Sequence, residues 1–428
     1  MKTVRTVSLL LALSMLFLFS ACGAETAGVP DTESPRDESG EAETVSEKTE
    51  KLTADFVSGV KGEKPDESFI AAYDRFAAEL FARTRRSGEN SLVSPLSVLY
   101  ALAMTFSGAE GETLSQFLRA FDGRGDIDVD KIGASLAGLA AGLYKGESAY
   151  TDIANSIWVK NRPDLRLKDG FIERNERYFR SDVYAVPFNQ ATLGEINGWV
   201  SANTGGMIKE ILKELPEDTV MCLVNAVLFE AKWARQYTQK FKMDFTKADG
   251  KKIKVDMLYS YESEFISTEN AKGFIKNYIG NGYSFVAVLP NGTLDDYMET
   301  FDGAELSALL SSRKDVPVMA ETPAFKYDFS DDLSGVLRAM GITDAFTDNA
   351  DFSGMFEEKT DISISKVIHK TRIEVDTEGT RAAAATAVVM TEGAAMIEHE
   401  TVILNRPFLY MIIDANTDTP MFIGTYEG

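Results

Sequence analysis

The sequence has few of the residues that most enzymes and disulfide-bonded proteins need. Its 428 residues include two cysteines and two histidines. Two cysteines cannot build a disulfide framework or a four-cysteine zinc site. A histidine-based catalytic triad would have to use His369 or His399, and the chain contains no G-x-S-x-G, H-E-x-x-H or P-loop motif. We therefore expect a protein that is not an enzyme and uses no metal or cofactor, with a carboxylate-only hydrolase as a weak alternative.

Positive charge is also scarce. The chain has 66 acidic and 44 basic residues, so its formal net charge is −22. Such a surface would not neutralise phosphates, which argues against nucleic acid as a partner. Much of the acidity is local, because residues 25–50 hold nine acidic and two basic residues and almost no large apolar side chain. A segment of this kind cannot bury enough surface to fold, so residues 22–63 are predicted to form a disordered acidic tether.

The N-terminus has the pattern of an export signal. Two basic residues precede an apolar run over residues 8–19, and small residues and Cys22 follow. This pattern predicts a signal peptide over residues 1–21, too short for a membrane-spanning helix. The region resembles the lipobox of bacterial lipoproteins, although Phe19 stands where leucine is usual. The resemblance implies that Cys22 is lipidated and anchors an exported chain on the cell surface or outer membrane, with a plain secretory signal as the alternative.

After the tether, helices and strands mix without a regular alternation. Apolar residues at helical spacing predict a helix over residues 66–86, and Pro95 is placed to begin a second helix that ends near residue 106. Strand-like runs cover residues 153–159, 222–229, 283–289, 362–367, 401–404 and 408–413. The pattern predicts an α+β protein with more than one sheet and one domain over residues 64–428, with Cys222 as a buried, inert thiol.

The segment over residues 374–390 is unusual because two local preferences compete in it. Four consecutive alanines favour a helix, whereas Gly379 before them is a flexible joint and the Thr-Ala-Val-Val-Met that follows favours a strand. In a strand, one face would be small, then apolar, and free of charge, while Arg381 would lie on the other. The residues of that face are Thr380, Ala382, Ala384, Thr386, Val388 and Met390. Such a segment could be exposed in one state and enter a packed sheet in another.

Together with this segment, six blocks in order along the chain resemble the serpins, a family of protease inhibitors. The blocks cover residues 90–97, 197–208, 223–233, 325–326, 340–354 and 402–412, the last with the sequence VILNRPFLYMI. The resemblance extends over nearly the whole chain after the tether. It implies the serpin fold, with mixed helices, a large central sheet, further sheets and a reactive loop exposed near the C-terminus.

The resemblance also assigns roles to individual residues. Ser94, Ser97, Asn225 and His369 match the polar cluster called the shutter, beneath the central sheet where two strands part to admit the reactive loop. Trp233 matches the tryptophan of the breach, near the top of that sheet where the loop enters. Without the resemblance, His369 and Trp233 would be read as ordinary core residues. The hinge of the loop matches Gly379, Thr380, Arg381, Ala382, Ala383, Ala384, Ala385 and Thr386.

Two hinge positions depart from the family pattern, because Thr377 and Arg381 stand where glutamate is usual. Neither lies on the face that would be buried, and the alanine run is intact. The sequence therefore favours an inhibitor over a non-inhibitory member that kept the fold as a surface binding lipoprotein.

The family mechanism implies a position for the bond that a protease would cleave. In long-loop members this bond lies fourteen residues beyond the hinge glycine, which selects the bond between Gly393 and Ala394. Counting back from Pro407 gives Met396 instead, so the neighbouring registers at Ala394, Ala395 and Met396 stay open. Small residues here fit a shallow specificity pocket. The expected partners are elastase-like or subtilisin-like serine proteases, with papain-like cysteine proteases as a further class. We expect a monomer that contacts membrane only through the lipid anchor.

Overall fold

The computed structural model describes residues 9–21, 48–53, 62–143, 149–237, 239–280, 282–377 and 399–428. The predicted helix over residues 66–86 is α1 (Glu67–Thr84), which begins where the Asp66 carboxylate accepts a hydrogen bond from the Phe69 N–H at 2.8 Å. The second predicted helix is α2 (Pro95–Phe106), with Ser94 as its N-cap. The remaining helices are α3 (Gly111–Asp122), α4 (Val129–Gly142), α5 (Asp169–Phe179), α6 (Gln190–Asn203), α7 (Leu294–Thr300), α8 (Gly303–Ser311) and α9 (Ser334–Ala339), with 3₁₀ turns η1 (Pro163–Leu165) and η2 (Asp344–Phe346).

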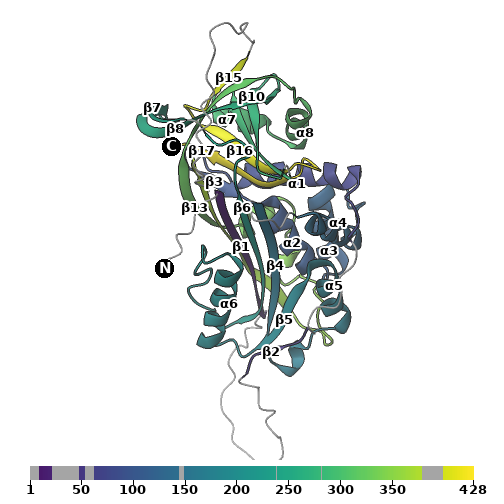
Figure 1. The fold of residues 1–428 in the computed structure, drawn as a ribbon. Helices are drawn as coiled ribbons and strands as arrows, with labels where there is room; N and C mark the ends of the chain where they lie inside the picture. The colour runs from purple at the N-terminus through teal and green to yellow at the C-terminus, as the bar shows by residue number, and fades with distance from the viewer. Residues whose placement is uncertain are drawn as a thin grey trace, which may run out of the picture.

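A seven-stranded central sheet runs the length of the lower body in Figure 1. Its order is β13 (Phe325–Asp332), β14 (Ile362–Val375), β1 (Leu9–Ala21), β6 (Thr219–Ala231), β4 (Ala149–Lys160), β5 (Ser181–Val186) and β2 (Glu50–Lys51). The pairing of β4 with β5 is parallel and the other pairings are antiparallel. The predicted strands at residues 153–159, 222–229 and 362–367 lie within β4, β6 and β14.

Two smaller sheets lie beyond one end of the central sheet (Figure 1). One has the order β3 (Ser91–Val93), β17 (Pro420–Tyr426), β16 (Phe408–Asp414), β11 (Tyr283–Pro290), β10 (Ala271–Asn277) and β9 (Glu264–Ser267). The other has the order β15 (Glu400–Ile403), β12 (Val318–Pro323), β8 (Lys252–Glu262) and β7 (Gln239–Thr246). The prediction of an α+β protein with several sheets is confirmed, and so are the predicted strands near residues 283, 401 and 408.

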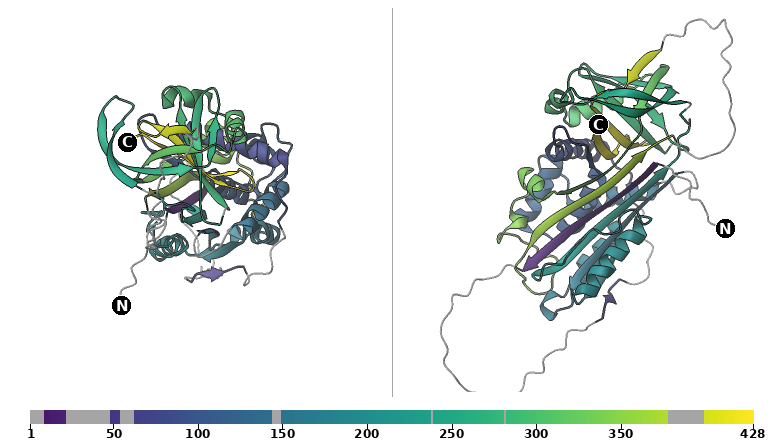
Figure 2. Two further views of the ribbon diagram at one scale, coloured as in Figure 1. Left: turned by 45° about the horizontal axis from the view of Figure 1, so that its top comes forward. Right: turned by 90° about the vertical axis from the view of Figure 1, so that its left-hand side faces the viewer.

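The central sheet is buried on both faces. On one face its side chains join the main core, which includes most residues of the apolar helix α2. On the other face, α6 covers the sheet, and side chains of β1 and β6 pack with those of α6 in a second core. In Figure 2 (right), the teal α6 lies on one side of the sheet and blue helices, α2 among them, lie on the other. Cys222 lies in the second core and is a buried free thiol, as the sequence predicted.

Two strands of the central sheet come from segments that the sequence assigns outside the folded domain. Leu9–Ala21, within the predicted signal peptide, forms β1, and Glu50–Lys51, within the predicted tether, forms β2 at the edge of the sheet beside β5. A signal peptide and a strand buried on both faces have the same sequence signature, a continuous apolar run. The composition of residues 8–19 therefore could not indicate that the run fits into the sheet. Cys22 lies outside the described residues.

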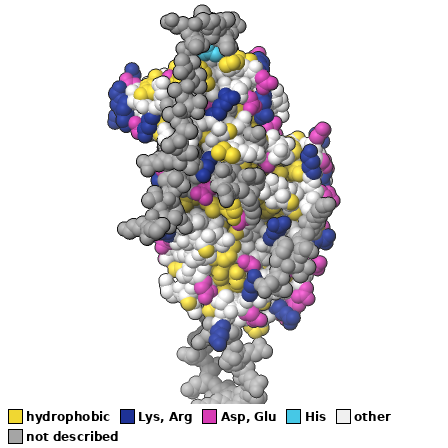
Figure 3. Space-filling model, viewed as in Figure 1, with side chains coloured by type: hydrophobic (Ala, Val, Ile, Leu, Met, Phe, Trp, Pro, Cys, Tyr) yellow, Lys and Arg dark blue, Asp and Glu magenta, His cyan; other side chains and the backbone are white. Residues whose placement is uncertain are grey.

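Charge is unevenly spread over the surface. In Figure 3, lysine and arginine side chains gather over β7 and β8, although the chain as a whole is acidic. Part of this positive charge is paired, because Asp256 contacts Lys240 and Lys242, and Asp244 contacts Lys254. Among the described helices, none combines the length and the apolar character that a membrane crossing requires.

Candidate functional site: a strand slot and the polar residues beside it

The position between β6 and β14 in the central sheet is the feature that the sequence assigned to loop entry. We call this position the strand slot. In the structure β1 fills it, antiparallel to both neighbours, from Leu10 opposite Glu374 to Ala21 opposite Ile362 on the β14 side. Figure 2 (right) shows the purple β1 lying between the yellow-green β14 and the teal β6. The slot is therefore wide enough for one complete strand.

The four predicted shutter residues are buried around the middle of the slot. Ser94 and Ser97 begin α2, and the Ser94 hydroxyl accepts a hydrogen bond from the Ser97 N–H at 3.2 Å. The Ser97 hydroxyl donates to the Asn225 side-chain oxygen, and the Asn225 amide donates to Asn155 on β4 at 2.7 Å. The Asn155 amide in turn donates to the Phe179 carbonyl at 2.6 Å. This chain of bonds fixes β6 to β4 and α2 on one side of the slot.

His369 of β14 stands on the other side of the slot. Its Nε2 accepts a hydrogen bond from the Ser94 N–H at 3.4 Å, whereas its Nδ1 is buried and has no hydrogen-bond partner among the described residues. Met15 of β1 pairs with His369 on one side and with Asn225 on the other. The shutter is thus brought together around α2 but divided within the sheet, and β1 is the element that divides it.

The breach lies at the end of the slot where Glu374 pairs with Leu10. The Trp233 indole N–H donates to the carbonyl of Asp376 at 3.2 Å, so Trp233 holds the backbone just after β14. Its ring stacks on Tyr278 with centroids 4.5 Å apart. On the outer strand, the Lys326 ammonium contacts the Glu374 carboxylate at 2.5 Å and joins β13 to β14. The last described residues before the predicted hinge are therefore anchored by the side chains of Trp233, which follows β6, and of Lys326 on β13.

A buried ion pair supports Trp233. The Lys276 ammonium lies 2.6 Å from a Glu262 carboxylate oxygen and donates to the Arg235 carbonyl at 2.9 Å. It also lies over the rings of Tyr237 and Trp233, at 4.3 and 5.4 Å from their centroids. The Lys276 side chain is fully buried and that of Glu262 is 6 % exposed. Burial lowers the pKa of Lys276, and the Glu262 carboxylate opposes that shift.

Comparison with known proteins decides the family. The family model described as "Serpin (serine protease inhibitor)" matches residues 71–427. The chain belongs to the serpin family. Human neuroserpin is 30 % identical over 81 % of this chain and 88 % of its own length. An uncharacterized serpin-like protein of Methanosarcina mazei is 29 % identical over 98 % of this chain and 97 % of its own. The crystal structure of the thermophilic serpin tengpin in its native state superposes with a TM-score of 0.79 and 37 % identity, covering 87 % of this chain and 97 % of tengpin.

The serpin fold predicted from the sequence is confirmed, whereas several predicted site residues lie where the structure gives no description. All eight hinge residues, from Gly379 to Thr386, lie outside the described residues. So do Gly393 and Ala394, at the predicted reactive bond. Of the predicted site, the structure describes the strand slot and the residues predicted for the shutter and the breach.

Two groups of site residues were missed at the sequence level. Asn155 belongs to the shutter and could have been noticed, because it is a polar residue inside an apolar run predicted as a strand, as Asn225 is. Lys276 and Glu262 gave no signal, since a lysine and a glutamate in a chain rich in both are normally solvated. Only the fold brings them together under Trp233.

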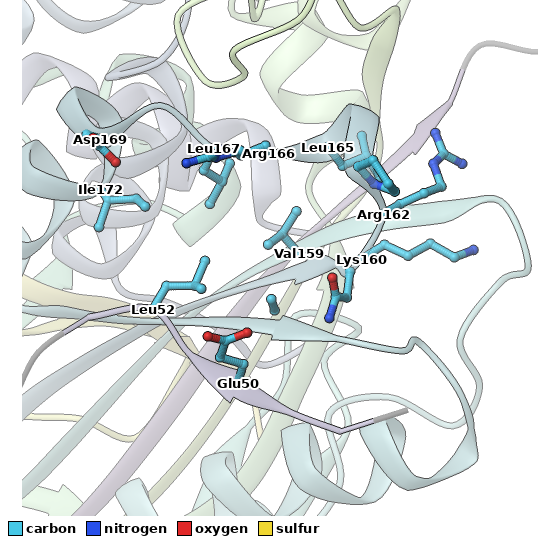
Figure 4. A pocket seen from close by; sticks show the side chains of 13 residues that line it. Glu50, Leu52, Val159, Lys160, Arg162, Leu165, Arg166, Leu167, Asp169 and Ile172 are labelled. Atoms are coloured by element: carbon cyan, nitrogen blue, oxygen red, sulfur yellow. The ribbon is translucent and has the colours of Figure 1, made fainter. Parts of the chain in front are cut away.

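A hollow of about 700 Å³ lies at the far end of the central sheet from the breach (Figure 4). Glu50 and Leu52 line one side, and residues of β4, η1 and α5 line the other. Its two arginines are already paired, Arg162 with Asp164 at 2.6 Å and Arg166 with Glu357 at 3.4 Å. Across the described ranges, no group of three histidine, cysteine or acidic side chains is placed to hold a metal. We therefore take the strand slot, and not this hollow, as the candidate functional site.

Burial of His369 makes the stability of the shutter depend on pH. Burial lowers the pKa of His369 to about 3, whereas an unfolded histidine titrates near its ordinary value of about 6.5. The unfolded chain therefore takes up the proton first, and the free energy of unfolding falls as the pH drops below about 6.5. At about 1.4 kcal/mol per pH unit, the contribution of His369 at pH 4.5 is a loss of about 2–3 kcal/mol relative to pH 7.5.

Urea unfolding at both pH values tests this expectation. The difference in the free energy of unfolding between pH 7.5 and pH 4.5 should shrink by about 2–3 kcal/mol in His369→Gln, because the titrating group is gone. The matched control is His399→Gln, which removes the other histidine of the chain, at an exposed position. Equal pH dependence in the wild type and His369→Gln would show that His369 is not held neutral in the folded chain.

Proposed function

We propose that this serpin is a suicide inhibitor of serine proteases. The protease cleaves it between Gly393 and Ala394, and insertion of residues 379–392 into the strand slot then traps the protease. The observation that carries the proposal is that the slot between β6 and β14 holds a complete additional strand, β1, of 13 residues. A sheet that accommodates such a strand can accommodate the reactive loop, whose alternating face is small near the hinge and apolar further on.

The chemistry of trapping belongs to the protease. Its nucleophile attacks the Gly393 carbonyl carbon, the amide bond to Ala394 breaks, and Ala394 leaves as a free amine while Gly393 stays on the enzyme as an acyl group. Residues 379–392 can then enter the slot. At about 3.3 Å per residue the inserted strand would span about 45 Å, enough to carry the protease to the opposite end of the sheet. The acyl-enzyme persists because the displaced protease can no longer deacylate.

Small residues around the predicted bond suggest the target class. Thr391, Glu392 and Gly393 precede the bond and Ala394 follows it. A shallow or constricted specificity pocket accepts such residues, whereas the acidic pocket of a trypsin-like enzyme would stay unfilled. We therefore propose elastase-like or subtilisin-like targets, with papain-like cysteine proteases as a further class.

Incubation with a small protease panel tests the targets. With the chain that lacks residues 1–21, elastase and subtilisin should each give a complex that survives denaturing electrophoresis, and mass spectrometry should find a released C-terminal peptide that begins at Ala394. Trypsin should give none with the wild type, but should form the complex with Gly393→Arg, which supplies the basic side chain that its pocket requires. Stoichiometric trapping of trypsin by the wild type, with mere digestion by elastase and subtilisin, would refute the assignment.

The proposed location of the protein in the cell rests on its N-terminal sequence and not on its fold. We propose that the mature chain is exported, anchored by lipid on Cys22 at the cell surface or outer membrane, and monomeric. Metabolic labelling with a fatty acid should mark the wild type and leave Cys22→Ser unlabelled.

A further inference from the structure

The strand slot has room for one strand, and the N-terminal segment of the chain occupies it. β1, which we call the leader strand, pairs with β14 and with β6 along its length. Because each strand inside a sheet uses its backbone groups on both edges, a second strand cannot enter while the leader strand is present. Removal of β1 from the order β14-β1-β6 would leave β14 and β6 as neighbours.

The leader strand fits the slot on both faces. Its side chains from Met15 to Phe19 are at most 1 % exposed. Phe19 packs edge-on against Phe352 at 5.2 Å on the face of the main core, and Leu16 and Leu18 lie in the second core with α6. The neighbouring strands adapt to it at one level, where the Ser365 hydroxyl donates to the Leu18 carbonyl at 3.1 Å beside a shift in strand register. These contacts show a fitted strand.

The leader strand also runs in the direction that a competing loop would need. It is antiparallel to β14, beginning beside Glu374 near the breach and ending beside Ile362. A segment that follows β14 and turns back must take this same direction. Its presence has a local cost, since Met15 separates His369 from Asn225 and His369 Nδ1 is left buried without a partner among the described residues. Departure of the leader strand would let the two halves of the shutter approach.

We infer that the leader strand is an intramolecular plug, so that the chain that retains residues 9–21 cannot trap a protease and becomes an inhibitor only when this segment leaves the slot. The inference rests on the proposed function, because it names what competes with the loop. It predicts that the retained leader turns the protein into a plain substrate, whose loop is cleaved without insertion. The cell that makes the inhibitor would then be protected from it until the N-terminus is processed.

The test compares full-length chains made by cell-free synthesis without membranes, which retain residues 1–21. Phe17→Asp and Met15→Asp each place a carboxylate at a buried position of the leader strand and should expel it. Ser20→Asp, at a half-exposed position of the same strand, is the matched control. Hydrogen exchange should find the backbone of residues 9–21 protected in the wild type and control, and exposed in the two variants.

Two further readouts follow the slot itself. With subtilisin, the wild type and Ser20→Asp should give at least about tenfold less covalent complex than Phe17→Asp and Met15→Asp, since trapping scales with the fraction of open slots. Cleavage of the loop should raise the melting temperature of the two variants and leave that of the wild type unchanged. A synthetic peptide of residues 9–21, added to Phe17→Asp, should abolish both effects.

The outcomes separate the plug from the proposed function. If the wild type traps subtilisin as well as Phe17→Asp does, or if residues 9–21 exchange freely in it, the plug is refuted and inhibition stands. If loop cleavage raises the melting temperature of none of the chains, although exchange shows the leader expelled, then the loop does not insert at all. That result would overturn the proposed function and the plug with it.

Discussion

Replacement of Thr380 by arginine should convert this serpin from an inhibitor into a substrate. Thr380 is the first residue after Gly379 on the small, uncharged face of the predicted strand, the face that we expect to be buried on insertion. A buried, unpaired guanidinium costs several kcal/mol. A penalty of about 2 kcal/mol in the transition state for entry would slow insertion about thirtyfold. Deacylation would then win, and the loop would be cut without trapping.

Ala383→Arg is the matched control for Thr380→Arg. It adds the same side chain three residues later, on the opposite face of the strand, where the natural sequence already tolerates Arg381. Titration of subtilisin on denaturing gels should show little covalent complex for Thr380→Arg, and for Ala383→Arg nearly as much complex as Phe17→Asp alone gives. Both variants should also carry Phe17→Asp, so that residues 9–21 do not occupy the slot. Undiminished complex with Thr380→Arg would rule out insertion in the proposed register.

Much of the fold could be predicted because its elements are marked locally. Asp66 and Pro95 mark the starts of α1 and α2, and apolar runs mark β4, β6, β11 and β16. The order of the strands in the sheets could not be obtained in this way. It depends on strands far apart in the chain, such as β14 and β6 on either side of β1, and the resemblance to the family supplied only the expectation of a large central sheet and further sheets.

The place of residues 9–21 shows where local patterns stop being informative. An apolar run of this length suits an export signal, and it suits equally a strand packed between two cores, because each environment selects only for apolar side chains. What distinguishes the second use is the partner, a slot bounded by β6 and β14. That slot is a property of the whole sheet. The same holds for Lys276, whose neighbours Glu262, Arg235 and Trp233 come from other strands and loops.

Glu262→Gln should be among the most destabilising single substitutions in the breach. It keeps the shape of the side chain but leaves the Lys276 ammonium buried without its counter-ion, and breaking a buried pair in this way costs about 3–5 kcal/mol. Lys276→Met should cost a similar amount, since it leaves the Glu262 carboxylate unpaired and removes the cation from the rings of Trp233 and Tyr237. The double variant Glu262→Gln with Lys276→Met should recover most of the loss, because no unpaired charge remains.

Urea unfolding of the four chains measures the coupling between the two residues. The matched control is Lys254→Met, which breaks an ion pair with Asp244 whose side chains are 68 % and 46 % exposed and should cost less than about 1 kcal/mol. Additive effects of the two single substitutions would contradict a coupled pair. Covalent trapping by the same chains shows whether the ion pair also matters for loop entry, because Lys276 supports the tryptophan that binds Asp376.

The pH dependence of Glu262→Gln identifies the buried cation as the cause of its instability. Burial already lowers the pKa of Lys276 in the wild type, and removal of the carboxylate that opposes this shift should lower the pKa further. The unfolded chain, in which lysine titrates near pH 10.4, then binds more protons than the folded chain below that pH. The free energy of unfolding of Glu262→Gln must therefore rise with pH over this interval. The difference in stability between the wild type and Glu262→Gln should then narrow between about pH 7 and pH 10. A deficit that stays constant over this range would mean that lost packing, and not the unpaired ammonium, destabilises the variant.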